Sequence, residues 1–227
     1  MAKKQNEFEK QDEQLQEVNN ALTGAGQWIE KNSKTLSWCV TALVLVVLGF
    51  MAYKQMVVQP KQQAATEANG VNVWAYLAGD FEKAVNGDEA AGAEGFAATA
   101  DSYSNQEGKL AALFAGTCYY EMGQYAEAVE YLSQFSSNDL HFKAVAKQLL
   151  GDSYVELGEY EAALDAFKAA AETNNEVFAP MSLKKAGIVY LKLEDKAGAF
   201  DAFNTIKEKY PSSVEAQDIE KYIAVAK

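Results

Sequence analysis

The chain contains 227 residues with a formal net charge of −12, and all 20 of its basic residues are lysines. Arginine is the usual partner of phosphate and guanine, and an acidic surface repels a polyanion, so we expect no nucleic-acid partner. The two cysteines, Cys39 and Cys118, lie in segments expected to occupy different environments. A disulfide between them is therefore not expected, and cysteine usage leaves the cellular compartment open.

Residues 1–34 are mostly polar and are interpreted as a cytoplasmic tail. Phe8, Leu15, Val18 and Leu22 recur at intervals of seven, three and four residues, which places a thin apolar stripe on a polar helix. Two interpretations stay open: a helix that docks on a cytoplasmic or membrane partner, or a fraying tail without stable structure.

An uncharged apolar run from Leu36 to Tyr53 follows, bounded by Lys34 and Lys54. A helix rises about 1.5 Å per residue, so the run would extend roughly 27 Å, close to the hydrocarbon thickness of a bilayer. Trp38 and Tyr53 lie near its ends, where amphipathic aromatic side chains favour the lipid–water boundary. No A-x-A cleavage site follows the run. We therefore predict one transmembrane signal-anchor helix at residues 35–54, with a buried core helix as the alternative.

Charge alone sets the orientation of this helix only in part. Two lysines lie close to it on each side, and the more distant Lys3, Lys4 and Lys10 favour a cytoplasmic N-terminus. Residues 55–71 are assigned to a linker, in which the chain around Pro60 either continues the anchor helix or hinges below it.

A repeat follows, marked by Gly116, Gly151 and Gly187 at spacings of 35 and 36 residues. Each glycine is followed by a tyrosine three residues later, an alanine twelve residues later and a large apolar residue sixteen residues later. These positions are Tyr119, Tyr154 and Tyr190; Ala128, Ala163 and Ala199; and Leu132, Phe167 and Phe203. Gly123 and Gly158 stand seven residues after the first two glycines, where the third unit has Glu194.

Each unit is predicted to be a pair of antiparallel helices. The first glycine, which lacks a Cβ, lets the second helix approach closely, and the second glycine ends the first helix in a left-handed turn. A single unit does not bury its own apolar face, so the units are expected to stack. The predicted fold is therefore all-α: a single N-terminal transmembrane helix followed by an α-solenoid of helical hairpins.

The third unit carries the order G-x-x-Y, then Ala, Phe and Pro, which resembles the tetratricopeptide repeat. The residues of this order are Gly187, Tyr190, Ala199, Phe203 and Pro211. The first two units depart from the family pattern at the proline position, where Leu140 and Asn175 stand. The usual tryptophan is also missing, and its positions hold Ala112, Lys147 and Leu183. These departures indicate irregular units but keep the helix–turn–helix interpretation.

The repeat domain is assigned to residues 72–227, with units at about 72–108, 109–143, 144–179 and 180–211 and a capping helix at 212–227. The first unit is degenerate, with one helix expected to carry Trp74, Leu77, Phe81 and Val85 and to break at Gly87-Asp88. The sequence Ser212-Ser213-Val214-Glu215 is typical of a capping box and predicts that the last helix begins there. Its residues expected to pack are Val214, Ile219, Tyr222, Ile223 and Ala226.

No catalytic constellation is visible in the sequence. His141, the single histidine, is placed in a loop between two repeats, and Cys118 beside Tyr119 is interpreted as a small packed residue. No run matches a phosphate loop, a zinc spacing or a calcium loop. The sequence therefore predicts neither an enzyme, nor a metal site, nor a cofactor.

The candidate binding site is the inner face of the solenoid, which the first helix of each tetratricopeptide unit lines. The predicted groove residues are Leu110, Leu113, Thr117 and Tyr120; Val145, Gln148, Asp152 and Val155; and Met181, Lys184, Ile188 and Leu191. Two possibilities stay open: a groove open to partners, or a face filled by the chain's own C-terminal helices. Leu113 and Thr117 stand where a carboxylate clamp would need a basic residue and an asparagine, which argues against a cytosolic chaperone-tail receptor.

The order of tail, anchor helix and acidic degenerate repeats resembles the ancillary SecYEG translocon subunit family of the YfgM type. The resemblance implies a single-pass protein of the bacterial inner membrane, with a cytoplasmic N-terminus and a periplasmic repeat domain. It also implies three partners: the SecYEG translocon, a membrane-anchored prolyl isomerase chaperone, and the unfolded secreted polypeptides that the protein assists. The alternatives are a structural scaffold of another envelope complex and a mitochondrial import receptor, the latter disfavoured by the missing clamp.

Overall fold

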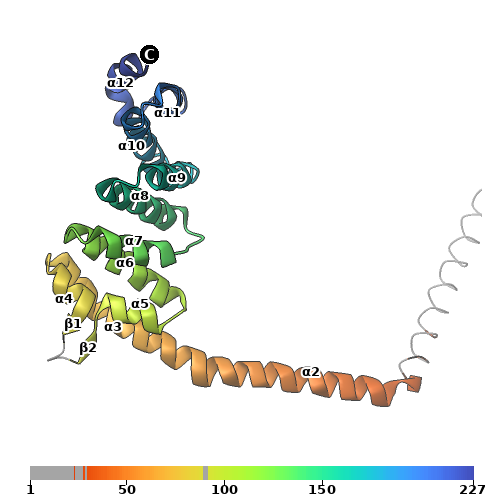
Figure 1. The fold of residues 1–227 in the computed structure, drawn as a ribbon. Helices are drawn as coiled ribbons and strands as arrows, with labels where there is room; N and C mark the ends of the chain where they lie inside the picture. The colour runs from red at the N-terminus through yellow and green to blue at the C-terminus, as the bar shows by residue number, and fades with distance from the viewer. Residues whose placement is uncertain (1–22, 24–27, 29, 89–91) are drawn as a thin grey trace, which may run out of the picture. The chain divides into compact units, whose positions relative to one another are not determined.

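The computed structural model describes residues 23, 28, 30–88 and 92–227, and the chain divides after Pro60 into two units (Figure 1). The apolar stripe expected in the tail lies outside the described residues. The first part of the chain carries α2 (Ser33–Tyr53) and a π-helical turn, η1 (Lys54–Val58). The following elements are α3 (Gln59–Leu77), α4 (Phe81–Asn86), β1 (Gly87–Asp88), β2 (Ala93–Glu94), α5 (Phe96–Ser102), α6 (Gln106–Glu121), α7 (Tyr125–Gln134), α8 (Leu140–Leu157), α9 (Tyr160–Ala171), α10 (Phe178–Lys192), α11 (Lys196–Lys209), η3 (Glu215–Gln217) and α12 (Ile219–Ala226).

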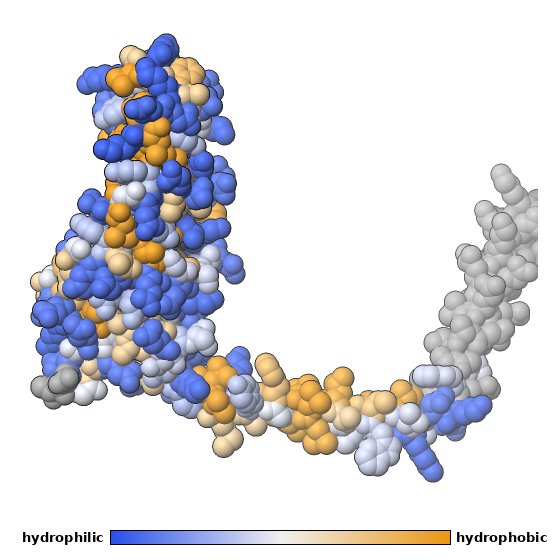
Figure 2. Space-filling view, in the orientation of Figure 1, coloured by the Kyte–Doolittle hydropathy of each residue, from blue (hydrophilic) through white to orange (hydrophobic). Residues whose placement is uncertain are grey.

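Helix α2 has no buried residue, and apolar side chains make up much of its visible surface (Figure 2). Its Thr41 hydroxyl donates to the backbone oxygen of Ser37 at 2.8 Å, so this polar group is satisfied within the helix itself. A soluble core helix would bury its apolar side chains against neighbours. The structure therefore shows no core packing for α2, which is long and apolar enough to cross a membrane.

The segment expected to be a linker, residues 55–71, is helical, and its later part belongs to the second unit. Ala65, Asn69 and Asn72 are buried. The Asn69 side chain donates to the backbone oxygen of Glu107 at 3.0 Å, and that of Asn72 to the backbone oxygen of Glu94 at 2.7 Å. These bonds attach α3 to β2 and α6, with which it lies in the unit that begins at Lys61.

The helix expected to carry Trp74 through Val85 is two helices in the structure. Helix α3 ends at Leu77, and α4 begins at Phe81 after Gly79 turns the chain with a φ of 79°. Trp74 and Leu77 are exposed on α3. The expected break at Gly87-Asp88 is present, because these residues form β1 and pair antiparallel with β2.

Three helical hairpins, α6/α7, α8/α9 and α10/α11, follow one another and stack within residues 61–227 (Figure 1). In each hairpin, the glycine that marks the repeat faces the large residue sixteen positions later: Gly116 faces Leu132, Gly151 faces Phe167, and Gly187 faces Phe203. A Cβ on any of these glycines would overlap that side chain. The predicted close approach of the two helices is therefore confirmed in all three units.

The turns inside the hairpins also agree with the prediction. Gly123 and Gly158 have φ values of 74° and 77°, in the left-handed region that glycine enters without steric cost. Glu194 takes the same conformation in the third unit, with a φ of 62°. The turn geometry is thus shared by the three units, although only two of them carry glycine.

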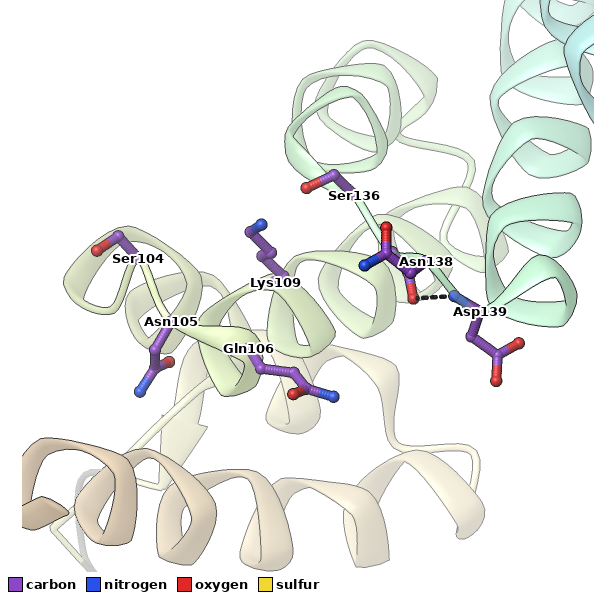
Figure 3. Close-up of a pocket in the computed structure, with 8 residues that line it drawn as sticks. Ser104, Asn105, Gln106, Lys109, Ser136, Asn138 and Asp139 are labelled. Atoms are coloured by element: carbon purple, nitrogen blue, oxygen red, sulfur yellow. Dashed lines mark hydrogen bonds between the residues drawn. The ribbon is translucent and has the colours of Figure 1, made fainter. Parts of the chain in front are cut away.

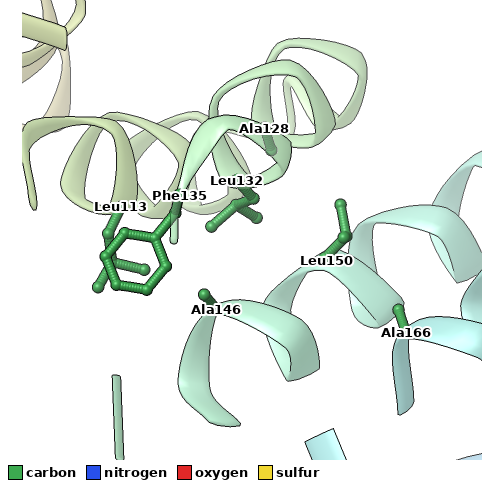
Figure 4. Close-up of a cluster of buried hydrophobic side chains, with 7 residues drawn as sticks. All are labelled: Leu113, Ala128, Leu132, Phe135, Ala146, Leu150 and Ala166. Carbon is green, nitrogen blue, oxygen red and sulfur yellow. The ribbon is translucent and has the colours of Figure 1, made fainter. Parts of the chain in front are cut away.

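The core runs between hairpins as well as within them. One buried cluster joins the hairpin α6/α7 to the hairpin α8/α9 and consists of Leu113, Ala128, Leu132, Phe135, Ala146, Leu150 and Ala166 (Figure 4). Two further clusters centre on Phe167 and on Phe203, and the latter extends to Ile219 and Ile223 of α12. Because each cluster draws on neighbouring elements, the apolar face of a hairpin is buried by the next element in the stack.

The C-terminal segment differs from the expected capping helix. Ser213 accepts a hydrogen bond from the backbone N–H of Ala216 at 3.2 Å, but the residues after it form the short turn η3, and α12 begins only at Ile219. Asp218 precedes α12 without capping it, because its carboxylate pairs with Lys184 of α10. Val214 is exposed, whereas Ile219, Ile223 and Ala226 are buried as expected.

Candidate functional site

The predicted binding face belongs to the first helices of the three hairpins, α6, α8 and α10, which contact one another in order. Of the twelve predicted groove residues, eleven are at least partly exposed on these helices. These eleven are Leu110, Thr117, Tyr120, Val145, Gln148, Asp152, Val155, Met181, Lys184, Ile188 and Leu191. Leu113 is the exception, because it is buried against Ala146 and Leu150 of α8. It belongs to the core and not to the groove.

Polar contacts connect α8 to α10 across this face. The ammonium of Lys185 lies 2.6 and 2.8 Å from the two carboxylate oxygens of Asp152. Gln148 contacts the sulfur of Met181 at 3.2 Å and accepts from the Ser182 hydroxyl at 3.3 Å. Desolvation raises the pKa of Asp152, and the bond with Lys185 only partly offsets this shift. The Asp152 carboxylate is therefore partly withdrawn from water, and its pair with Lys185 joins α10 to α8.

Tyr120 of α6 lies close to these polar groups of α8. Burial raises the pKa of its phenol, and the negative charges of Asp152 and Glu156 raise it further. Its ring meets that of Tyr125 edge-on, with centroids 5.6 Å apart. The groove is thus acidic and aromatic over α6 and α8.

The C-terminal segment forms one wall of a cavity of about 370 Å³ over α10. The cavity is lined by Met181, Lys184, Lys185, Ile188, Val214, Glu215, Gln217 and Asp218. Lys184 connects the two walls: its ammonium lies 2.7 Å from Asp218 and 4.6 Å from the centroid of the Tyr222 ring. Ile188 is 46% exposed and Val214 is 74% exposed. The chain's own C-terminus therefore borders the groove at this end without filling it.

The sequence predicted three of the cavity residues, Met181, Lys184 and Ile188, and missed the other five. Lys185 lies one position from a predicted residue and is brought into the groove by its pairing with Asp152. Residues 214–218 were assigned to a capping helix, and only the tertiary contact with α10 places them here. No local pattern in the sequence indicates this contact.

A second cavity, of about 490 Å³, lies between the segment before α6 and the segment before α8 (Figure 3). Its residues include Asn105 and Asp139, whose side chains accept from the backbone N–H groups of Gly108 and His141. These are helix caps, worth about 1 kcal/mol each. Two of the polar side chains of this cavity thus have roles in folding.

Cys118 and His141 have structural surroundings. Cys118 is buried among the side chains around Phe96, and burial raises the pKa of its thiol to about 12. A thiol of this kind stays protonated at neutral pH and is a poor nucleophile. His141 lies in the first turn of α8 and not in a loop. Its Nδ1 is 2.8 Å from the Asn175 amide, and its ring contacts Phe178 edge-on, so it helps to join α8 to the start of α10.

Comparison with known proteins places this fold. Residues 26–221 match a family described as "Tetratricopeptide repeat-like domain". A crystal structure of MamA protein shares 22% identity at a TM-score of 0.58, over 73% of this chain and 81% of that one. A tetratricopeptide repeat protein from Parabacteroides merdae ATCC 43184 shares 22% identity at a TM-score of 0.56, over 72% of this chain and 60% of that one. No curated protein sequence matches the chain.

Proposed function

This chain belongs to the tetratricopeptide repeat-like domain family, and we propose that it is a membrane-anchored module whose groove holds segments of other polypeptides. Repeats of this family are protein–protein interaction modules. The observation that carries the proposal is the apolar cavity bordered by Ile188 and Val214, at the end of a face where eleven of the twelve predicted residues are at least partly exposed. Apolar pockets with a few placed polar groups are the usual form of a binding site.

In its specific form, the proposal places the module beside the SecYEG translocon with a membrane-anchored prolyl isomerase chaperone, assisting secreted polypeptides as they emerge. The N-terminus would be cytoplasmic, and the repeats would lie in the periplasm. Two features support it: α2, which is long and apolar enough to cross a membrane, and a groove suited to the apolar side chains that unfolded chains expose. The order of these elements along the chain supplies the likeness to the YfgM-type family.

Site-specific photocrosslinking tests this proposal. A photoreactive amino acid at position 188 should crosslink to chains in transit through inner-membrane vesicles. The matched control is position 225, which is also apolar and exposed but lies on α12 outside the cavity. After gentle detergent extraction, the SecYEG channel and the prolyl isomerase should co-purify. Equal crosslinking from both positions, or recovery of outer-membrane assembly components alone, would refute the proposal.

Protease accessibility tests the orientation separately. In cells with a permeabilised outer membrane, added protease should cleave the repeats, while an epitope at the N-terminus stays intact. Cleavage of the epitope with protected repeats would reverse the proposed topology.

A second candidate function is a structural scaffold for an envelope complex, favoured by the exposed apolar face of α3. Val71, Trp74 and Leu77 lie at helical spacing on this face, and Trp74 is 75% exposed. A fixed interface of that kind predicts that Trp74→Glu releases a stable partner, while position 188 crosslinks to no unfolded chain. The groove proposal predicts the opposite pair of results.

A further inference from the structure

We infer that the groove selects polypeptide segments that carry a basic side chain close to a bulky apolar one. The apolar side chain enters the cavity between α10 and residues 214–218, and the basic one lies over the acidic face of α6 and α8. This inference rests on the proposed function and names the class of segment that the groove takes.

The cavity is suited to an apolar side chain. Met181, Ile188 and Val214 supply its apolar surface, and its volume of about 370 Å³ falls within the range of roughly 300–1,000 Å³ usual for small binding sites. Both of its lysines are engaged, since Lys184 pairs with Asp218 and Lys185 pairs with Asp152. An ammonium already paired inside the protein offers little attraction to an acidic ligand. The cavity therefore does not favour anionic segments, although two lysines line it.

The neighbouring face is suited to a cation. Asp152 is already paired with Lys185, but the negative charges of Glu156 and Glu121 also act on Tyr120. Within the described part of the chain, no ion pair involves Glu121 or Glu156. Carboxylates beside an aromatic ring favour lysine and arginine, because the ring face attracts cations as well.

The charge of the whole repeat region acts in the same direction. Residues 61–227 contain 14 lysines and 26 acidic residues, whereas residues 1–60 contain six of each. The net charge of −12 therefore lies entirely beyond residue 60. A field of one sign raises the rate at which oppositely charged segments arrive and discourages those of like charge. Charge complementarity thus selects a basic segment over an acidic one with the same apolar residues.

The test measures binding of three fluorescent peptides to the full chain in zwitterionic lipid nanodiscs, with empty nanodiscs as the blank. The peptides share length and apolar residues and carry three lysines, three glutamines or three glutamates. Fluorescence anisotropy should show the lysine peptide binding about tenfold or more tightly than the glutamate peptide. Its affinity should fall several-fold as ionic strength rises from about 0.05 to about 0.5 M, because salt screens charges at the surface.

Four variants separate the two parts of the site. Ile188→Asp should weaken all three peptides, and Glu156→Gln should weaken only the lysine peptide. The matched controls, Val225→Asp and Glu172→Gln, change exposed residues outside the groove and should bind like the parent. Thermal melting confirms that each variant is folded.

The outcomes distinguish the inference from the proposed function. If the three peptides bind equally and Ile188→Asp still weakens them, the preference for basic segments is wrong while the groove remains a binding site. If no peptide binds, the inference and the groove function both fail. If Glu156→Gln and Glu172→Gln weaken the lysine peptide alike, the attraction is a general effect of net charge and the assignment to α6 and α8 is overturned.

Discussion

Replacing Gly151 tests the repeat register most directly. A Cβ on Gly151 would lie 2.5, 2.6 and 2.9 Å from three atoms at the edge of the Phe167 ring. Ordinary carbon–carbon contacts are about 3.5–4.0 Å, so the ring would have to move by about 1 Å. Phe167 is 1% exposed and is held by a cluster that includes Leu164 and Val189, so it has little room to move.

The expected cost follows from two opposing effects. Overpacking a filled core costs about 1–3 kcal/mol, whereas alanine gains about 1 kcal/mol over glycine in a helix. Gly151→Ala should therefore destabilise by about 0–2 kcal/mol, and Gly151→Val, with more atoms and less helix propensity, by about 1–3 kcal/mol. For a unit of this size, 1 kcal/mol corresponds to about 2–4 °C in Tm, so the valine variant should melt roughly 2–12 °C lower.

Thermal melting of the full chain in detergent, followed by circular dichroism, measures these values. The control is Gly70→Ala on α3, where an added Cβ meets nothing within 4 Å. It should stabilise by about 0.5–1 kcal/mol through helix propensity alone. Shortening the opposing side chain with Phe167→Leu should recover part of the loss in Gly151→Ala, on the order of 1 kcal/mol of coupling. If Gly151→Val melts like the parent, the assigned contact between the two helices is wrong.

Three further predictions concern the turn, the anchor and the C-terminal segment. Gly158→Ala should destabilise by about 1–2 kcal/mol in the same melting assay, because its φ of 77° is strained for a residue with a Cβ, and an unchanged Tm would contradict the left-handed turn. Leu45→Lys should raise the cost of membrane insertion by about 3 kcal/mol and release part of the protein on alkaline extraction, whereas full retention in the pellet would argue against the span. The hydrogen bond with Lys184 lowers the pKa of Asp218, so the stabilisation by this pair is complete above the ordinary value of 3.8 and is lost as the pH falls from there through the lowered pKa. Hydrogen-exchange protection factors over residues 214–226, which correct for the slower intrinsic exchange in acid, should therefore fall below about pH 3.8 for the parent and change less for Asp218→Asn. Equal changes in the two proteins would show that the pair does not stabilise this segment.

The sequence predicted the hairpins well because their defining contacts are local. Each repeat glycine meets a side chain sixteen residues later in the same hairpin, so a fixed spacing reports the contact without knowledge of the rest of the fold. The left-handed turns at Gly123 and Gly158 follow from glycine's missing Cβ in the same way. The apolar run that forms α2 is likewise a property of consecutive residues.

Other features of the repeat region depend on contacts between residues that are far apart in the sequence. Asn69 was assigned to the linker and Asn72 to the first position of the repeat domain, and both side chains are buried because they bond to the backbone oxygens of Glu107 and Glu94. Leu113 was assigned to the groove by its position in the repeat, but packing against the following unit buries it.

The candidate site was likewise predicted from the sequence only in part. Composition and spacing alone determined an all-α chain with one apolar helix and an acidic repeat region, and they predicted which helices carry the binding face. Only the tertiary structure decided that residues 214–218 form the second wall of a cavity, since Asp218 pairs with Lys184 across 34 positions instead of capping the helix that follows it. A helix cap is worth about 1 kcal/mol, and an ion pair that also joins two elements competes with it for the same carboxylate. A sequence pattern indicates the cap, because the cap is local, but it does not indicate the ion pair with a distant residue.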